Sequence, residues 1–224
     1  MIKLLAFDWD DVFSLGAKEG YFACYHKALD DVGIHLEAEE EKKRILAKWS
    51  KPFREELKEL LKEKLELVDK ACKMYEKEYW GSTFLNCLSV LPGINELLLR
   101  LKKKYILAVA TGNHPKMLKE KIITQFNIPN VFSQIFSTFE IKDPEKMKPH
   151  PYMLEDIMKK QGCKPEETLF IGDAKTDVQM AYNAGVIPIV VLTGHLNRKE
   201  AEELKVKYII DKVTSLERVL TGFN

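Results

Sequence analysis

The side chains best suited to chemistry are carboxylates that directly follow apolar segments. Asp8 and Asp10 come after the apolar run at residues 2–7, and Asp173 and Asp177 come after a similar run late in the chain. Carboxylates this close repel one another unless a cation lies between them. Three or four of them gathered together form an oxygen-ligand site for a hard divalent ion, and Mg²⁺ suits such a site. The plainer alternative is that these acids begin loops or cap helices.

Two further segments could bind an anion. Thr111, Gly112 and Asn113 follow another apolar run and offer a hydroxyl, an amide and backbone N–H groups at a predicted helix start. Such a turn favours anions. Lys148 precedes a proline, which restricts it to an extended backbone, and it adds a positive charge. Taken alone, each feature is also typical of a helix cap or a solvated loop, but their order along the chain favours one shared site.

Buried strands must bring these segments together. Six apolar segments predict strands, at Ile2–Phe7, Ile106–Ala110, Ile135–Ser137, Thr168–Ile171, Ile187–Leu192 and Tyr208–Ile210. Helical patterns separate them at about residues 94–104, 115–125, 151–161, 176–184 and 198–204. This alternation predicts an α/β fold with a parallel sheet covered on both faces. Groups at the carboxyl ends of its central strands then face a common crevice.

The stretch between Ser14 and Cys87 breaks the alternation, because it shows helical periodicity and no strand signal. Of the 42 residues from Glu37 to Glu78, 24 are charged, 12 acidic and 12 basic, which indicates solvated helix faces. Pro52 is predicted to open one of the helices. Apolar residues recur in steps of three and four, at Ile45, Trp49, Phe53, Leu57, Leu60, Leu61, Val68, Cys72, Tyr75 and Tyr79.

Composition argues against several classes of protein. The net charge of +1 provides no global field for nucleic acid or an anionic membrane, and the apolar run at residues 186–192 is too short to span a bilayer. The first residues lack the pattern of a secretory signal, so a cytoplasmic protein is expected. Four cysteines without a CxxC pair favour packing roles over metal or redox use. Abundant Lys and Glu fit a heat-adapted source, although a long solvated helical region would give the same count. A monomer or homodimer is expected.

In their order along the chain, the four chemical segments resemble the four motifs of the haloacid dehalogenase superfamily. The matching residues are Asp8-Trp9-Asp10, Thr111, Lys148, and Gly172-Asp173 with Asp177. The helical insert resembles the C1 cap of the phosphoglycolate-phosphatase-like branch, as do the turns at Gly33 and residues 91–93 and the segments 191–195 and 208–211. The resemblance implies a Rossmann-like core at residues 1–14 and 88–224, with an all-helical cap at 15–87.

The resemblance also implies roles for the residues. Asp8 would attack phosphorus and carry an aspartyl phosphate, while Asp10 would act as general acid and then as general base. Mg²⁺ would be held by Asp8, the backbone carbonyl of Asp10 and Asp173, with Asp177 orienting this metal site. The phosphoryl group would be bound by Thr111, Gly112, Asn113 and Lys148.

Three positions depart from the family pattern. Asp11 stands where the family usually has glycine, which adds a carboxylate near the site and removes backbone freedom. Val12 replaces a frequent threonine, and Leu15 occupies a position where many C1-capped members carry aspartate. Asp10, in contrast, matches the branches that transfer phosphoryl groups, because dehalogenases and phosphonate-cleaving members lack an acid there.

The expected activity is therefore hydrolysis of a small phosphorylated metabolite by a Mg²⁺-dependent phosphatase. One alternative is a phosphomutase of the β-phosphoglucomutase type, which shares all four motifs. Another is a phosphate-binding module without catalysis. Within the cap, Tyr21, Phe22, Tyr25 and His26 lie on the first predicted helix, where they either contact a ligand or pack the cap interior, and packing is the favoured interpretation.

Overall fold

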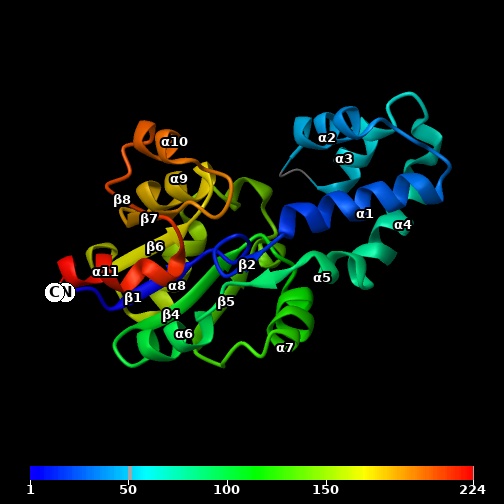
Figure 1. The fold of residues 1–224 in the computed structure, drawn as a ribbon. Helices are drawn as coiled ribbons and strands as arrows, with labels where there is room; N and C mark the ends of the chain where they lie inside the picture. The colour runs from blue at the N-terminus through cyan, green and yellow to red at the C-terminus, as the bar shows by residue number, and fades with distance from the viewer. Residues whose placement is uncertain (50–51, 224) are drawn as a thin grey trace. The chain divides into compact units, whose positions relative to one another are not determined.

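The computed structural model describes residues 1–49 and 52–223, and the chain divides into two compact units. Unit 1 contains Met1–Leu15 and Ser89–Asn224, and unit 2 contains Gly16–Leu88. The boundaries predicted from the sequence, after residues 14 and 87, each lie one residue from these. Figure 1 shows the strands gathered in unit 1 and helices throughout unit 2.

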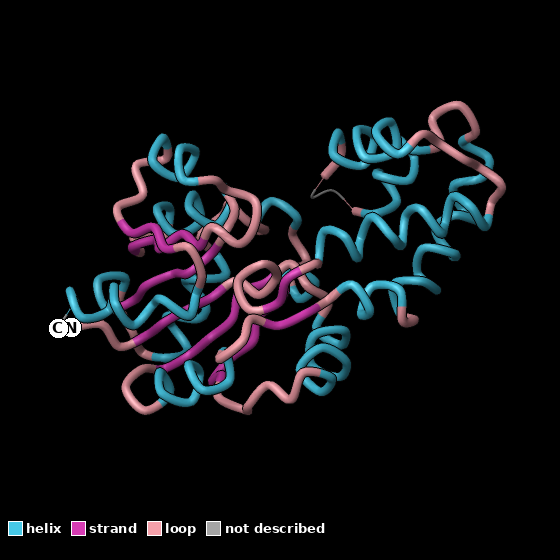
Figure 2. The backbone as a smooth tube through the Cα atoms, viewed as in Figure 1, coloured by secondary structure: helices cyan, strands magenta, loops and turns pink. Residues whose placement is uncertain are grey.

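Six parallel strands form the sheet of unit 1, in the order β5-β4-β1-β6-β7-β8 (Figures 1 and 2). They are β1 (Leu4–Phe7), β4 (Ile106–Thr111), β5 (Phe132–Ser137), β6 (Thr168–Gly172), β7 (Ile187–Val191) and β8 (Tyr208–Ile210). Each corresponds to a predicted strand, so the predicted α/β class with a parallel sheet is confirmed. β1 lies in the middle, where Leu4 pairs with Ile106 on one side and with Thr168 on the other.

Helices alternate with these strands along the chain. They are α6 (Ile94–Lys102), α7 (Ile123–Gln125), α8 (Tyr152–Gln161), α9 (Lys175–Asn183), α10 (Arg198–Glu203) and α11 (Leu216–Leu220). The helix predicted at about 115–125 begins as a π-helix, Met117–Ile122, and continues into α7. The sequence analysis did not predict α11, whose five residues are too few to establish a helical period.

The core of unit 1 forms around β1, whose four residues are all fully buried. Neighbouring residues of a strand point to opposite faces, so a strand buried at every position has apolar cover on both. Leu4 and Ala6 belong to a buried cluster that includes Leu154 of α8 and Met180 of α9. These helices therefore pack against one face of the sheet.

Unit 2 is helical, as its periodicity predicted. Its helices are α1 (Ala17–Asp31), α2 (Ala38–Ala47), α3 (Phe53–Leu60), α4 (Val68–Trp80) and α5 (Thr83–Cys87). Pro52 is the N-cap of α3, close to its predicted position at a helix start. Seven of the ten residues predicted for the apolar stripes are buried, namely Ile45, Leu57, Leu60, Leu61, Val68, Cys72 and Tyr75.

The first helix of unit 2 contributes side chains to the interior of that unit. Tyr25 is buried, donates its hydroxyl to Glu56 and stacks on Tyr75 with ring centroids 4.5 Å apart. Tyr21 packs against Phe84 at 4.8 Å. His26 is exposed and pairs with Glu41 at 3.0 Å. The structure thus places Tyr25 in the packing role that the sequence analysis favoured.

A two-stranded antiparallel pairing joins β2 (Ser14–Leu15) to β3 (Ser89–Val90). The expectation that no strand lies between Ser14 and Cys87 is therefore wrong at its first two residues. Two residues are too few to show the alternation of a strand, and their partner is remote in sequence. Within the described residues, no helix combines the length and apolar character needed to cross a membrane.

Candidate active site

Three adjacent strands of the sheet end at the site. Asp8 directly follows β1, Thr111 is the last residue of β4, and Asp173 directly follows β6. Phe7 at the end of β1 pairs with Val109 on β4 and Ile171 on β6. Because the three strands are parallel and in register, their carboxyl ends meet at one edge of the sheet, which brings segments more than 100 residues apart together.

Lys148 joins two of the predicted acids. Its Nζ lies 2.9 Å from Oδ1 of Asp8 and 2.8 Å from Oδ1 of Asp177. The side chains are 12%, 14% and 2% exposed, respectively, so both ion pairs are shielded from water. Burial by itself lowers the pKa of Lys148, but the charges of Asp177 and Asp8 outweigh burial and raise it. The ammonium group therefore stays charged beside Asp8.

Asp8 is ionised near neutral pH in this setting. Burial raises its pKa to about 6, and the charge of Asp177 contributes in the same direction, while Lys148 opposes both. A carboxylate that has lost much of its hydration but keeps its charge is a better nucleophile than one in bulk water. The position and charge state of Asp8 are thus compatible with attack on an electrophile.

Asp10 differs from Asp8 in its hydrogen-bond partners and in its charge state. Asn113 donates its side-chain amide to Oδ1 and Oδ2 of Asp10, at 3.1 and 3.3 Å, and the hydroxyl of Ser14 lies 3.4 Å from Oδ1. Burial raises the pKa of Asp10 to about 8, with further contributions from the charges of Asp8 and Asp11. Near neutral pH Asp10 therefore retains a proton that it can donate. Two neighbouring carboxyls with separated pKa values are typical of an acid and a nucleophile that share one site.

The turn after β4 is held by hydrogen bonds of its own. The backbone N–H of Asn113 donates to Oγ1 of Thr111 at 3.0 Å, and the hydroxyl of Ser137 donates to the carbonyl of Asn113 at 2.6 Å. Since the Thr111 oxygen accepts this bond, its own hydrogen can be directed to another acceptor, such as a phosphoryl oxygen. Gly112 lies between Thr111 and Asn113 in the chain, and a Cβ added to it would meet no atom within 4 Å.

The sequence grouped Asn113 with the substrate-binding residues, whereas the structure places its amide against Asp10. Asn113 is fully buried, so this contact is also shielded from water. Ser14, the second partner of Asp10, was not among the predicted site residues. A serine four residues after an acid carries no recognisable signal, and the short pairing of β2 with β3 is what holds it there.

Asp177 organises the turn after β6. Its Oδ2 accepts the backbone N–H groups of Asp173 and Ala174, both at 3.2 Å. The alternative in which Asp173 caps the following helix is therefore wrong, because the carboxylate of Asp177 has that function. A Cβ on Gly172 would lie 2.5 Å from Oδ2 of Asp177, so the turn requires glycine.

The acids of the site fit a divalent cation. Asp8, Asp173 and Asp177 each offer a carboxylate oxygen, and these atoms lie within 4.8 Å of one another. Burial raises the pKa of Asp173 well above its ordinary value, and repulsion from Asp177 and Asp8 adds to the effect. A cation would relieve this repulsion, and an all-oxygen donor set suits Mg²⁺.

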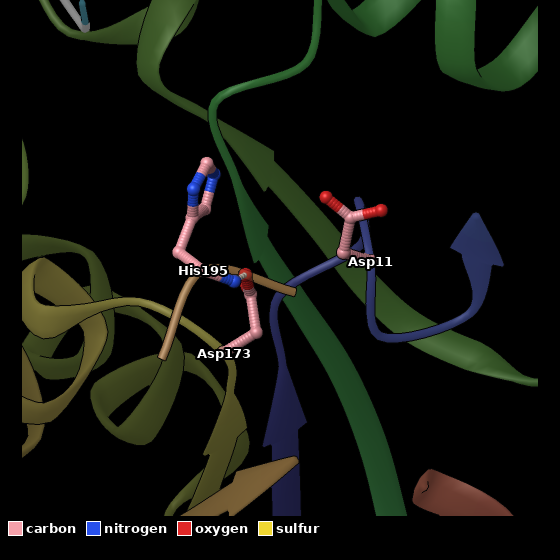
Figure 3. A group of neighbouring side chains, drawn as sticks. All are labelled: Asp11, Asp173 and His195. Atoms are coloured by element: carbon pink, nitrogen blue, oxygen red, sulfur yellow. Dashed lines mark hydrogen bonds between the residues drawn. The ribbon is translucent and has the colours of Figure 1, made fainter. Parts of the chain in front are cut away.

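Asp173 also belongs to a second group of possible metal ligands. Asp11, Asp173 and His195 have ligand atoms within 4.8 Å of one another, and Figure 3 shows the three residues. Asp11 has a φ of 56°, in the left-handed region that favours glycine. The position where the family usually has glycine therefore adopts the backbone for which glycine is suited, although aspartate occupies it here.

Solved structures share this fold. A protein from Haemophilus somnus 129pt, described as a predicted phosphoglycolate phosphatase, superposes with a TM-score of 0.83 at 22% identity and covers 98% of both chains. A candidate β-phosphoglucomutase from Thermotoga maritima superposes with a TM-score of 0.80 at 23% identity and covers 99% of both chains. At these identities the likeness concerns the fold alone.

Sequence comparison defines the family. Residues 5–191 match the haloacid dehalogenase-like hydrolases, and the chain belongs to this family, which confirms the resemblance seen in its motifs. The phosphoglycolate phosphatase of Haemophilus influenzae (strain 86-028NP) is 29% identical over 143 residues, 63% of this chain and 62% of that protein. The matched region thus spans less than two thirds of the length of such curated relatives.

Proposed function

We propose that this chain is a Mg²⁺-dependent phosphatase that hydrolyses a small phosphorylated metabolite through an aspartyl phosphate on Asp8. The observation that carries the proposal is the geometry of two neighbouring acids. Lys148 pairs with Asp8 at 2.9 Å, whereas the amide of Asn113 holds Asp10 at 3.1 Å, and burial raises the pKa of Asp10 to about 8, which favours its protonated form. Family membership and relatives named phosphoglycolate phosphatase support it.

In the first half-reaction, a carboxylate oxygen of Asp8 forms a bond to phosphorus as the bond from phosphorus to the leaving oxygen breaks. Asp10 transfers its proton to that oxygen, which departs as an alcohol. The positive charge of Lys148 and the hydroxyl of Thr111 stabilise the charge on the phosphoryl oxygens. Asp10 is left ionised beside the aspartyl phosphate.

In the second half-reaction, Asp10 takes a proton from water as the water oxygen attacks phosphorus. The bond from phosphorus to Asp8 breaks, inorganic phosphate leaves, and both acids return to their starting protonation states. One residue thus serves as acid and then as base, which a pKa of about 8 permits, since neither form is far from neutral pH.

Asp8, the backbone carbonyl of Asp10 and Asp173 would hold Mg²⁺, and Asp177 would orient this group. When bound, the ion reduces the repulsion between the carboxylate and the phosphate. Asp177 already binds Lys148 and two backbone N–H groups, so a supporting role suits it better than direct ligation.

A panel of phosphorylated metabolites with Mg²⁺, read as release of inorganic phosphate, tests the proposal, and 2-phosphoglycolate is the first compound to try because of the relatives' names. We expect activity that EDTA abolishes and Mg²⁺ restores, with Ca²⁺ a poor substitute because its larger shell permits geometries unsuited to in-line attack. Full activity in metal-free buffer would contradict the metal site.

The same panel separates the alternatives. An isomerised sugar phosphate without net phosphate release would indicate a phosphomutase, and binding without turnover of any compound would indicate a phosphate-binding module. The cytoplasmic location, the heat-adapted source and the monomeric or homodimeric state stay predictions.

A further inference from the structure

The loop that follows β7 wraps around Asp173. The backbone N–H of His195 donates to Oδ2 of Asp173 at 2.9 Å, and the N–H of Leu196 donates to the backbone carbonyl of Asp173 at 2.9 Å. One loop thus binds both the side chain and the main chain of a single acid. We call residues Thr193–Leu196 the 193-loop.

Gly194 makes this close approach possible. A Cβ at this position would lie 1.9 Å from Oδ2 and 2.5 Å from Cγ of Asp173, and 2.8 Å from Cβ of Asp11. Its φ lies outside the left-handed region, so backbone conformation does not require glycine here. The requirement is for space, because any side chain would displace the carboxylate of Asp173 or the side chain of Asp11.

The same loop also holds the segment after β1. The hydroxyl of Thr193 donates to the backbone carbonyl of Asp11. Asp11 has a left-handed backbone, which is uncommon for a non-glycine residue. Its neighbour Asp10 is the residue whose backbone carbonyl is assigned to the metal, so a fixed Asp11 restricts the direction of that carbonyl as well.

The far end of the 193-loop is fastened in the core of unit 1. Leu196 is 8% exposed and packs with Val178 of α9, Val190 of β7 and Ala201 of α10. An anchored residue next to His195 keeps the loop from following any movement of Asp173. The loop therefore acts on the acid from a fixed position.

We propose that the 193-loop is a positioning element that sets the Asp173 carboxylate for the divalent cation, with Gly194 as the residue it requires and Thr193 as the link to the nucleophile segment. The inference rests on the proposed function, because it assigns Asp173 to the metal. Asp8, Asp11 and Asp177 all surround Asp173 with negative charge, which would push its side chain away. The N–H of His195 opposes that movement and directs one oxygen.

Binding of Mn²⁺ alone, followed through the electron paramagnetic resonance signal of the free ion, tests the proposal without turnover. Gly194→Ala should raise the Kd for Mn²⁺ about 10-fold or more. Losing a group that holds a metal ligand in place usually weakens metal binding by at least this factor. Thr193→Val should raise the Kd in the same direction, and Thr193→Ser, which keeps the hydroxyl, should restore the parent value. Gly222→Ala is the matched control, because an added Cβ there meets nothing within 4 Å.

Asp173→Asn distinguishes a failure of the proposed metal site from a failure of the positioning role of the 193-loop. If it leaves the Kd for Mn²⁺ unchanged, the metal site of the proposed function is wrong. If it weakens binding while Gly194→Ala and Thr193→Val bind as the parent does, the metal site stands and the positioning role of the 193-loop is overturned. Circular dichroism shows which variants fold. If Gly194→Ala does not fold, the comparison of Thr193→Val with Thr193→Ser decides alone, and equal Kd values for these two would overturn the inference.

Discussion

The side-chain amide of Asn113 spans the carboxyl group of Asp10, with its nitrogen 3.1 Å from one oxygen and 3.3 Å from the other. Asn113 follows β4 and Asp10 follows β1, so the contact crosses two neighbouring strand ends. It fixes the orientation of the group to which we assign proton transfer. Without it, the carboxyl could rotate away from a leaving oxygen.

Replacing Asn113 with Ala should therefore lower kcat about 10-fold and change KM little, because it disturbs a group that acts in the transition state. Steady-state kinetics on the best substrate of the panel measure both constants. Asn113→Gln, which keeps an amide on a longer stem, should recover part of the loss. A raised KM with unchanged kcat would instead support the phosphate-binding role that the sequence predicted for Asn113.

Asp8→Asn should abolish turnover, because an amide is a poor nucleophile and cannot carry the phosphoryl group. Phosphate release measures the loss, and circular dichroism shows whether the variant folds. Asp211→Asn is a suitable control, since the side chain of Asp211 is 84% exposed and makes its ion pair with Arg198. Substantial activity remaining in Asp8→Asn would remove Asp8 from its assigned role.

Asp10→Asn should lower turnover of alkyl phosphates by ~10²-fold or more, if general acid–base catalysis makes its usual contribution. Aryl phosphates should lose less in the first half-reaction, because a phenolate leaves without a proton. Rapid quenching should then show a burst of phenol and a phosphorylated protein, since attack by water has become limiting. Parent-like turnover of alkyl phosphates would disprove the assignment, and Asp11 would become the next residue to test.

The raised pKa of Asp10 predicts that the free energy of unfolding decreases as the pH rises. The folded chain titrates this carboxyl at about 8, and the unfolded chain near the ordinary value of 3.8. Between these values the folded state binds more protons, so stability falls as the pH rises through this window. In EDTA, Asp10→Asn should unfold at a higher temperature than the parent at about pH 8, and the difference should vanish near pH 4. A constant difference across the range would refute the shift.

The left-handed backbone of Asp11 gives a matched pair of variants. Glycine adopts a φ of 56° without steric cost, whereas alanine brings its Cβ close to the neighbouring carbonyl. We expect Asp11→Gly to be more stable than Asp11→Ala by about 1 kcal/mol in urea unfolding. If the two variants are equally stable, this conformation is not the one the chain adopts in solution.

Local patterns in the sequence predicted the six strands of the parallel sheet in unit 1 and placed acids directly after two of them. Residues 106–110 and 169–171 are apolar at every position, and runs this short favour strands buried on both faces over helices. Parallel strands then place Asp8, Thr111 and Asp173 at one edge. Order along the chain was enough for this step, because right-handed crossovers leave few alternatives.

Tertiary structure decided which partner each of these groups has. No local pattern assigns the amide of Asn113 to Asp10 or the hydroxyl of Ser14 to the same carboxyl, since these contacts depend on how two turns face each other. The charge states of Asp8 and Asp10 could not be predicted from the sequence either. Burial is the largest influence on both pKa values, and burial is a property of the folded chain. The need for Gly194 arises from the space beside Asp173, a residue 21 positions earlier, and only the folded chain brings those two positions together.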